Sequence, residues 1–299
     1  MGEVKSRVKK AVIAVAGYGT RFLPATKNQP KQMLPIIDKP IVHYVVEEAV
    51  NSGIEEVILV TQAGQHSIED YFDSHFEIEK TLEETGKFEY LKIVRDIPQM
   101  ANFVYVRQKK HLPYGNGTPL LCAAPLIDDD ESFLYMFGDD MTLANSNITI
   151  SKQLINVFKS ERPDAILAVQ EVPDSEVQKY ATVKYKKKAD YKYEIEGILE
   201  KMPLGKNLSN MAQFGRFVFN YDVIREAEKT SLGKDNELWV TDILNNLAKK
   251  GKKVIAQPID GEWLTTGDPL HYMKAQVRFA LERKDIGNDF AEFLKNLKL

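Results

Sequence analysis

The chain of 299 residues has a formal net charge of −3, with 43% hydrophobic and 28% charged residues. This balance is typical of a soluble globular protein with one large α/β domain or two small ones, and it lacks the basic excess that nucleic-acid binding usually needs. The single cysteine, Cys122, excludes an intrachain disulfide and fits a reducing compartment. No apolar run approaches the roughly 18 residues of a membrane span, and residues 1–10 lack a signal-peptide core. We therefore expect a cytoplasmic protein without membrane or nucleic-acid partners.

The first half of the chain alternates short apolar runs with amphipathic stretches. The apolar runs predict strands at residues 10–16, 55–61, 103–108, 132–140 and 163–172. Helical spacing predicts helices at residues 41–53, 66–76, 118–127 and 150–161. In the third of these, Thr118 is the expected N-cap and Pro119 the first helical residue. This order predicts an α/β fold with a doubly wound, mostly parallel, Rossmann-like sheet.

The pattern changes after about Pro173. Residues 181–201 alternate apolar and polar side chains around a turn, which predicts a late antiparallel hairpin that makes the sheet mixed. The remaining predicted elements are a strand at 211–220, helices at 221–229 and 238–250, a strand at 252–258 and a C-terminal helix from about Pro269. Because we find no repeat and no linker composition, we expect one domain over residues 1–299.

The first predicted strand is followed by glycines and cations instead of a helix. Gly17 and Gly19 precede Arg21 and Lys31, but Phe22 stands where a dinucleotide fingerprint needs glycine and where a P-loop needs Gly-Lys-Ser/Thr. Glycines allow backbone N–H groups to approach phosphate, and the two cations can neutralise a polyphosphate. The residues alone leave open a second interpretation, in which this is an ordinary strand-to-helix turn with solvated cations.

A longer resemblance favours the phosphate interpretation. Residues 16–61, which include Gly-Tyr-Gly-Thr-Arg-Phe-Leu-Pro-Ala-Thr-Lys, resemble the signature of the bacterial-type UTP–glucose-1-phosphate uridylyltransferases, in the sugar-nucleotidyltransferase superfamily. The resemblance continues in the same order through residues 105–108, 121–127, 138–140, 172–180, 199–201, 214–219, 236–242 and 266–275. It therefore covers nearly the whole chain.

The resemblance implies a reaction between UTP and a sugar 1-phosphate, in which a sugar phosphate oxygen attacks the α-phosphorus in line, with Mg²⁺, and pyrophosphate leaves. The substrate supplies its own nucleophile, so catalysis rests on positioning and charge neutralisation. The five scattered histidines and Cys122 accordingly need no catalytic role. The resemblance also implies a nucleotide-binding half at about 1–140, a sugar-binding half with C-terminal helices at about 141–299, and a homodimer or homotetramer.

Roles for the nucleotide half follow from the same resemblance. Four residues would line the base and phosphates with backbone groups: Ala16, Gly17, Gly19 and Thr20. Arg21 would hold the β- and γ-phosphates, and Lys31 would face the reacting α-phosphate. Gln108 and the backbone of Gly115 would read the uracil edge.

The metal and sugar contacts are implied in the same way. Asp139 matches the aspartate that carries Mg²⁺, with Asp140 beside it at the end of a predicted strand, where open α/β sheets bind ligands. Glu200 and Lys201 would bind a sugar hydroxyl and the sugar phosphate, and Gly215 would let its backbone approach the sugar. The alternatives without a functional role are that the two aspartates form a solvated strand end and that Lys201 is one more surface lysine on a charged hairpin.

The chain departs from the family pattern at five places. These are Gly115–Pro119 in place of Gly-x-Gly-His-Ala, Ala181 in place of a glycine beside the sugar, Gln32 in place of glutamate, Met202 in place of proline, and Thr265 in place of aspartate. The glutamine is more typical of thymidylyltransferases. Most of these changes surround the sugar and the metal, so sugar identity is the part that the resemblance fixes least.

Thr265 stands where the family has its second metal-binding aspartate, and a hydroxyl is a much poorer Mg²⁺ ligand than a carboxylate. Three alternatives follow from this departure. Either Asp268 or Asp140 replaces the missing aspartate as a ligand, or the substrate phosphates hold most of the ion, or the activity is weak. Three hypotheses remain: a uridylyltransferase that makes UDP-glucose, the same chemistry with another sugar 1-phosphate or dTTP, and a weakly active relative that binds nucleotide-sugar and regulates a partner.

Overall fold

The computed structural model describes residues 7–187, 193–203 and 205–298. The strands in these residues are β1 (Lys10–Ala14), β2 (Pro35–Ile36), β3 (Lys39–Pro40), β4 (Glu56–Thr61), β5 (Asn102–Arg107), β6 (Ser132–Phe137), β7 (Asp140–Ala144), β8 (Ala165–Glu171), β9 (Ala181–Lys187), β10 (Tyr193–Leu199), β11 (Met211–Asn220), β12 (Val254–Pro258) and β13 (Gly261–Thr265). The α-helices are α1 (Ile41–Asn51), α2 (Ser67–Tyr71), α3 (Phe76–Glu84), α4 (Phe88–Asp96), α5 (Thr118–Ala123), α6 (Ile150–Glu161), α7 (Asp222–Ala227), α8 (Val240–Lys249), α9 (Pro269–Glu282) and α10 (Gly287–Asn296).

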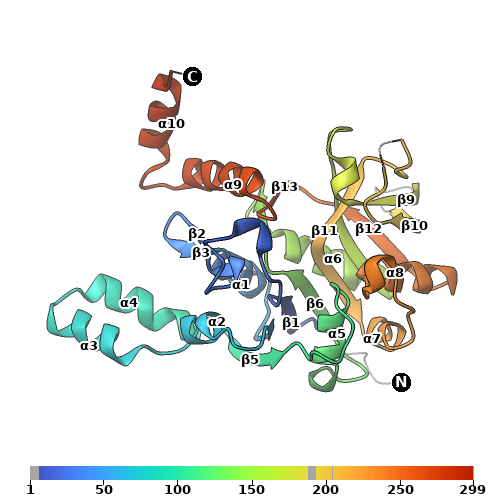
Figure 1. Ribbon diagram of the computed structural model, residues 1–299, viewed down its shortest axis with the longest axis horizontal. Helices are drawn as coiled ribbons and strands as arrows, with labels where there is room; N and C mark the ends of the chain where they lie inside the picture. Colours follow the sequence, from blue (N-terminus) through green and yellow to red (C-terminus); the bar gives the residue numbers. More distant parts are fainter. Residues whose placement is uncertain (1–6, 188–192, 204, 299) are drawn as a thin grey trace.

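One large sheet runs through the molecule in the order β5-β4-β1-β6-β11-β8-β12-β10-β9 (Figure 1). Strands β5, β4, β1 and β6 are parallel, whereas β11 runs antiparallel to both β6 and β8. The predicted late hairpin is the antiparallel pair β9–β10, and its turn, residues 188–192, lies outside the described residues. Because β9 also pairs with β11, this end of the sheet curls back on itself. The predicted α/β fold class is confirmed.

Helices cover both faces of the sheet because the central strands are apolar on both sides. On β1, Ala11 and Ile13 pack into the core that contains α1 and α6, whereas Val12 packs into the core that contains α5, α7 and α8. A third, smaller core lies under α9 and includes Leu34 and Met141. Each strand therefore ends between two helical layers, and the loops after β1 and β6 meet at one edge of the sheet.

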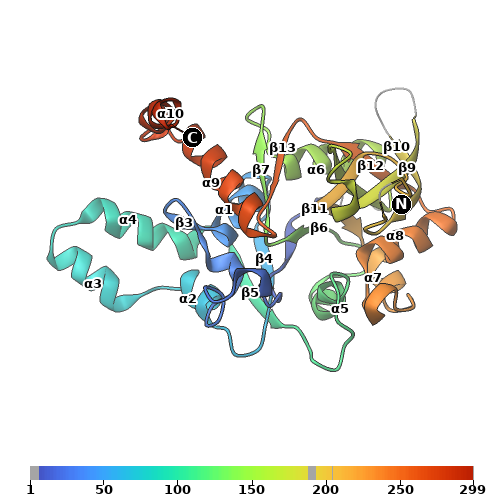
Figure 2. The same ribbon diagram turned by 45° about the horizontal axis from the view of Figure 1, so that its top comes forward.

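Two parts of the sequence prediction need correction. The helix predicted at residues 66–76 ends at Tyr71, and new helices α3 and α4 follow. These two helices project from the body as a pair and bury little apart from Leu91, so their sequence carries almost no core-facing pattern (Figure 2). The N-cap of α5 is Gly117, not Thr118, whose hydroxyl instead donates to the Pro113 carbonyl.

Helix α9 packs on the third core, and α10 projects beyond it as a second arm at the end of the chain (Figures 1 and 2). Among the described residues, no helix has the length and apolar character needed to cross a membrane.

A buried ion pair ties the helical layer to the sheet. Arg216 on β11 has no exposed surface, and its Nε and Nη2 donate to both carboxylate oxygens of Glu48 on α1 at 2.8–3.1 Å. Hydroxyls of Ser151 and Thr142 donate to the same carboxylate at 2.6 and 2.8 Å. Burial raises the pKa of Glu48, but the charge and hydrogen bonds of Arg216 outweigh it and leave the pKa below its usual value.

We predict that Glu48→Ala lowers the free energy of unfolding by about 3–5 kcal/mol, because it leaves the Arg216 charge buried and unpaired. Urea unfolding measures this. Glu47→Ala is the matched control, since Glu47 is on the same helix and contacts Lys39 with 40% of its side chain exposed. Equal stability of the Glu48 and Glu47 variants would contradict the role given to the buried pair.

Candidate active site

The glycine loop after β1 folds back over Lys31. Gly19 has the left-handed φ of 63°, and the Thr26 hydroxyl donates to its carbonyl at 2.8 Å. A Cβ at Gly19 would lie 3.1 Å from Cβ of Lys31, so a side chain there would crowd Lys31 in addition to the left-handed φ that favours glycine. The chain then makes the 3₁₀ turn η1 (Thr20–Phe22) instead of a helix. The loop therefore brings backbone groups and cations to one end of β1.

Lys31 and Asp139 face each other across the end of the sheet. Lys31 begins the 3₁₀ turn η2 (Lys31–Met33), and its Nζ pairs with the Asp139 carboxylate, with 17% and 23% of the two side chains exposed. Asp139 follows β6, and its backbone carbonyl accepts the Thr266 N–H at 3.0 Å and the Thr266 hydroxyl at 2.6 Å. The segment after β13 thus fixes the turn that carries the carboxylate.

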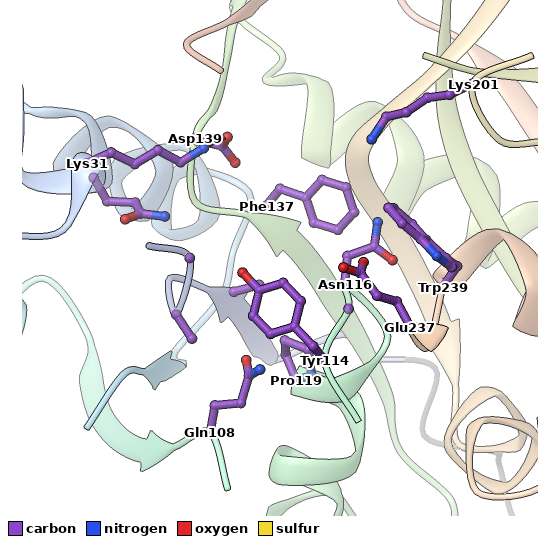
Figure 3. Close-up of a pocket in the computed structure, with 15 residues that line it drawn as sticks. Lys31, Gln108, Tyr114, Asn116, Pro119, Phe137, Asp139, Lys201, Glu237 and Trp239 are labelled. Carbon is purple, nitrogen blue, oxygen red and sulfur yellow. Dashed lines mark hydrogen bonds and ion pairs between the residues drawn. The ribbon is translucent and has the colours of Figure 1, made fainter. Parts of the chain in front are cut away.

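A cavity of about 330 Å³ opens between the glycine loop and the hairpin half of the sheet (Figure 3). It is lined by Ala14, Ala16, Gly17, Lys31, Gln32, Gln108, Tyr114, Gly115, Asn116, Pro119, Phe137, Asp139, Lys201, Glu237 and Trp239. Lys31 and Asp139 lie on one side, and Lys201 and Trp239 lie on the opposite side, with Phe137 between them (Figure 3). Side chains distant in sequence therefore converge on one space.

A second hollow of about 270 Å³ adjoins the first, and the two share Gly17, Lys31 and Tyr114. Gly19, Thr20 and Arg21 line it. Nη1 of Arg21 donates to the Gly267 carbonyl at 3.2 Å, which joins the glycine loop to the start of α9. The guanidinium is otherwise exposed and available to an anion.

Gln108 and Gly115 form the far wall of the main cavity. Gln108 follows β5, and its backbone N–H donates to the Thr61 carbonyl at 2.9 Å. Gly115 has a φ of 127°, and a Cβ there would lie 2.3 Å from the Leu238 carbonyl oxygen. Only glycine allows this loop to lie against the segment before α8.

Asp140 points the opposite way from Asp139. Its carboxylate accepts the Gly215 N–H and the Trp263 indole N–H, each at 2.8 Å, and only 6% of the residue is exposed. Burial, with the neighbouring Asp139 charge, raises the pKa of Asp140 to about 6. The structure therefore places Asp140 behind the cavity wall, where both of its oxygens already have partners.

Asp268 caps α9 and does not line the cavity. Its Oδ1 accepts the His271 backbone N–H at 3.1 Å, and its Oδ2 lies 2.7 Å from His271 Nδ1. Burial raises the pKa of Asp268, but the hydrogen bonds from His271 outweigh it, so the pKa lies below its usual value. Thr265 pairs in register with Asp140, and its hydroxyl accepts the Gly267 N–H at 3.2 Å.

The remaining predicted residues lie on the hairpin side. Lys201 lines the cavity, and its Nζ lies 3.5 Å from Oε1 of Glu200, which is largely buried behind it. Burial raises the pKa of Glu200. Ala181 is buried in β9 opposite Gln213 of β11. A Cβ at Gly215 would lie 2.4 Å from Phe137, so this glycine makes room for the ring that lines the cavity.

Several lining residues carry no role in the sequence analysis: Tyr114, Asn116, Phe137, Glu237 and Trp239. Their aromatic, amide and acidic side chains occur throughout the chain, so composition alone did not distinguish them. Gln32, noted only as a departure, is 2% exposed, and its Oε1 is buried without a partner among the described residues. Tyr114 also stacks on Tyr18 at 6.1 Å between ring centroids, which joins the two loops at the mouth of the cavity.

Comparisons with known proteins agree over almost the whole chain. A family model described as nucleotidyl transferase matches residues 10–281. A UTP–glucose-1-phosphate uridylyltransferase of Bacillus subtilis (strain 168) is 36% identical over 291 residues, which is 97% of each chain.

Solved structures give the same result. A UTP-bound UDP-glucose pyrophosphorylase from Acinetobacter baumannii has a TM-score of 0.88 at 34% identity and covers 98% of this chain and 100% of its own. A UDP-glucose pyrophosphorylase complexed with UDP-glucose has a TM-score of 0.83 at 35% identity and covers 93% of this chain and 100% of its own.

Proposed function

We propose that this chain, which belongs to the nucleotidyl transferase family and within it to the UTP–glucose-1-phosphate uridylyltransferases, joins UTP to glucose 1-phosphate and releases pyrophosphate. The observation that carries the proposal is the single cavity that gathers the glycine loop, the Lys31–Asp139 pair and Lys201. A cavity with cations at both ends suits two phosphorylated substrates that meet between them.

The reaction needs no activated side-chain nucleophile. An ionised phosphate oxygen of the sugar forms a bond to the α-phosphorus while the bond to the β-phosphate oxygen breaks, and pyrophosphate leaves with the electron pair. Lys31 neutralises charge at the α-phosphate, and Arg21, in the adjoining hollow, holds the β- and γ-phosphates. The protein contributes position and positive charge.

The base would occupy the end of the cavity near Gln108 and Gly115. Ala16, Gly17, Gly19 and Thr20 supply backbone groups along the nucleotide, and Gln108 with the Gly115 backbone reads the uracil edge. A site built on such hydrogen bonds disfavours bases that leave them unpaired. A structural relative is UTP-bound, which supports UTP as the nucleotide.

The sugar would occupy the end near Lys201. Lys201 binds the sugar phosphate with Glu200 behind it, and Gly215 on β11 acts through the room that it leaves for the Phe137 ring. Glu237 and Asn116 add a carboxylate and an amide that can hydrogen-bond to hydroxyls. Ala181 and Gln32 depart from the family pattern, which favours one alternative, namely the same chemistry with another sugar 1-phosphate or dTTP.

We propose Mg²⁺ as the cofactor, carried mainly by the nucleotide. Asp139 presents a carboxylate to the cavity, whereas the Asp140 oxygens are bonded inside the protein and those of Asp268 are bonded to His271 at the start of α9. No group of three or more metal-binding side chains occurs in the described part of the chain. This donor set fits Mg²⁺, which keeps its waters and commonly uses one or two carboxylates with substrate phosphates. When bound, the ion would neutralise phosphate charge.

We also propose that the chain forms one catalytic domain and works in the cytoplasm as a homodimer or homotetramer. Exposed apolar side chains on the two projecting arms support the assembly. Phe88 and Tyr90 are exposed on α4, and Phe293 is exposed on α10. A second copy of the chain would cover them.

The activity is tested by pyrophosphate release from UTP, dTTP, CTP and ATP, each combined with several sugar 1-phosphates, with and without Mg²⁺. We expect UTP with glucose 1-phosphate and Mg²⁺ to react fastest. A faster pair of other substrates would transfer the proposal to that pair. No pyrophosphate from any pair would contradict an enzymatic function and leave the weakly active regulatory relative that Thr265 suggests.

We predict that Lys31→Ala lowers kcat by about 10²–10³-fold while UTP binding weakens much less, because the charge is needed where negative charge develops. Steady-state kinetics and UTP titration measure the two effects. Lys27→Ala is the matched control, since Lys27 is an exposed cation of the same loop. Turnover of Lys31→Ala equal to that of the control would end this role for Lys31.

We predict that Thr265→Asp lowers the Mg²⁺ concentration needed for half-maximal rate, because it adds a carboxylate opposite the Asp139–Asp140 turn. Asp139→Asn should nearly abolish turnover. Asp268→Asn keeps a side-chain oxygen that can accept the His271 N–H, so it should preserve the cap of α9 and change the Mg²⁺ titration little. An Asp268→Asn variant as inactive as Asp139→Asn would show that Asp268 has become the second ligand.

A further inference from the structure

Trp239 lies in the cavity wall opposite Asp139, and none of the roles above involve it. It precedes α8 and lines the cavity with Lys201, Glu237 and Asn116 (Figure 3). The Lys201 ammonium lies over the indole, 4.9 Å from the ring centroid. This is within the distance at which the negative face of an aromatic ring attracts a cation.

The indole is held rigidly. Its Nε1–H donates to the Lys234 carbonyl at 3.0 Å. The preceding residue, Leu238, donates its N–H to the Tyr114 carbonyl and accepts the Gly117 N–H, each at 2.8 Å. These backbone bonds clamp the segment before α8 onto the loop that carries Gly115. The ring therefore has a fixed position relative to the base end of the cavity.

Lys201, by contrast, is held loosely. Its side chain is 42% exposed, and its Nζ lies 3.5 Å from Glu200 Oε1, a long contact for an ion pair. A lysine side chain has many rotamers, so it loses considerable conformational entropy when it is held in the one conformation that binds the phosphate. The ammonium has both the Glu200 carboxylate and the Trp239 ring as neighbours.

We propose that Trp239 is a positioning residue, whose ring holds the Lys201 ammonium where the sugar phosphate binds. Unlike the Glu200 carboxylate, a neutral ring attracts the cation without neutralising it, so this contact takes no positive charge away from the phosphate. The inference rests on the proposed function, because it assigns the sugar phosphate to Lys201. It adds a residue that acts through Lys201 on affinity for the sugar substrate and not on the nucleotide.

Two variants isolate the ring face. Trp239→Phe and Trp239→Leu both lose the indole bond to Lys234, but only the phenylalanine keeps an aromatic face. We expect the KM for glucose 1-phosphate to be about two- to five-fold higher in the leucine variant than in the phenylalanine variant. The KM for UTP and the melting temperature should be the same in both. An equal KM for glucose 1-phosphate in the two variants overturns the inference.

A double-mutant cycle tests whether the ring acts through Lys201. In a Lys201→Met background the ammonium is absent, so exchanging phenylalanine for leucine at position 239 should change neither KM nor kcat. The same two- to five-fold difference in that background would mean that the ring acts on the sugar directly, and this result also overturns the inference.

Calorimetric titration with UDP-glucose separates this inference from the proposed function, because it needs no turnover. If the wild type releases no pyrophosphate but the leucine variant binds UDP-glucose about two- to five-fold more weakly than the phenylalanine variant, the positioning role stands and the enzymatic proposal fails. If turnover is normal and the two Kd values are equal, the positioning role alone fails. No UDP-glucose binding by the wild type contradicts both.

Discussion

A guanidinium group without solvent contact sets the geometry on which the cavity depends. Arg216 is fully buried, and a buried charge persists only when it is paired and hydrogen-bonded. Glu48 supplies the opposite charge, and the remaining N–H groups donate to the carbonyls of Phe137, Gly215 and Asp140. These carbonyls belong to β6, β11 and β7, so one planar group with fixed donor directions holds three strands together.

This constraint explains why two adjacent aspartates have different environments. The Asp140 carbonyl is held by Arg216, and its carboxylate by Gly215 and Trp263, so the side chain is fixed inside the protein. Asp139, one residue earlier, then points to the other side of the chain, towards Lys31 and the cavity. The buried Asp140 therefore orients Asp139, and replacing Asp140 would have a different consequence from replacing Asp139.

The sequence was sufficient for the parts of the structure that local patterns control. Apolar runs located the central strands, whereas the spacing of Gly17 and Gly19 left both a ligand loop and an ordinary turn open, and the family resemblance favoured the first. Pattern could not distinguish Asp139 from Asp140, because alternation says that neighbours point apart but not which one faces the cavity. Nor could it find α3 and α4, which contact mostly each other, or assign a role to Trp239, whose partner lies on a distant hairpin.

The cavity must attract two phosphorylated substrates while the chain carries a net charge of −3. Each cationic side chain of the cavity therefore has to be oriented before its substrate binds. The two central lysines are held in different ways. Asp139 holds Lys31 by charge, so a phosphate that displaced this contact would leave the carboxylate without its partner, and the proposed Mg²⁺ would take that place. At Lys201 the Glu200 carboxylate lies 3.5 Å away, and the Trp239 ring adds an attraction that does not neutralise the ammonium. The two lysines therefore differ in how closely a carboxylate neutralises them, and this difference follows from the groups that orient each ammonium.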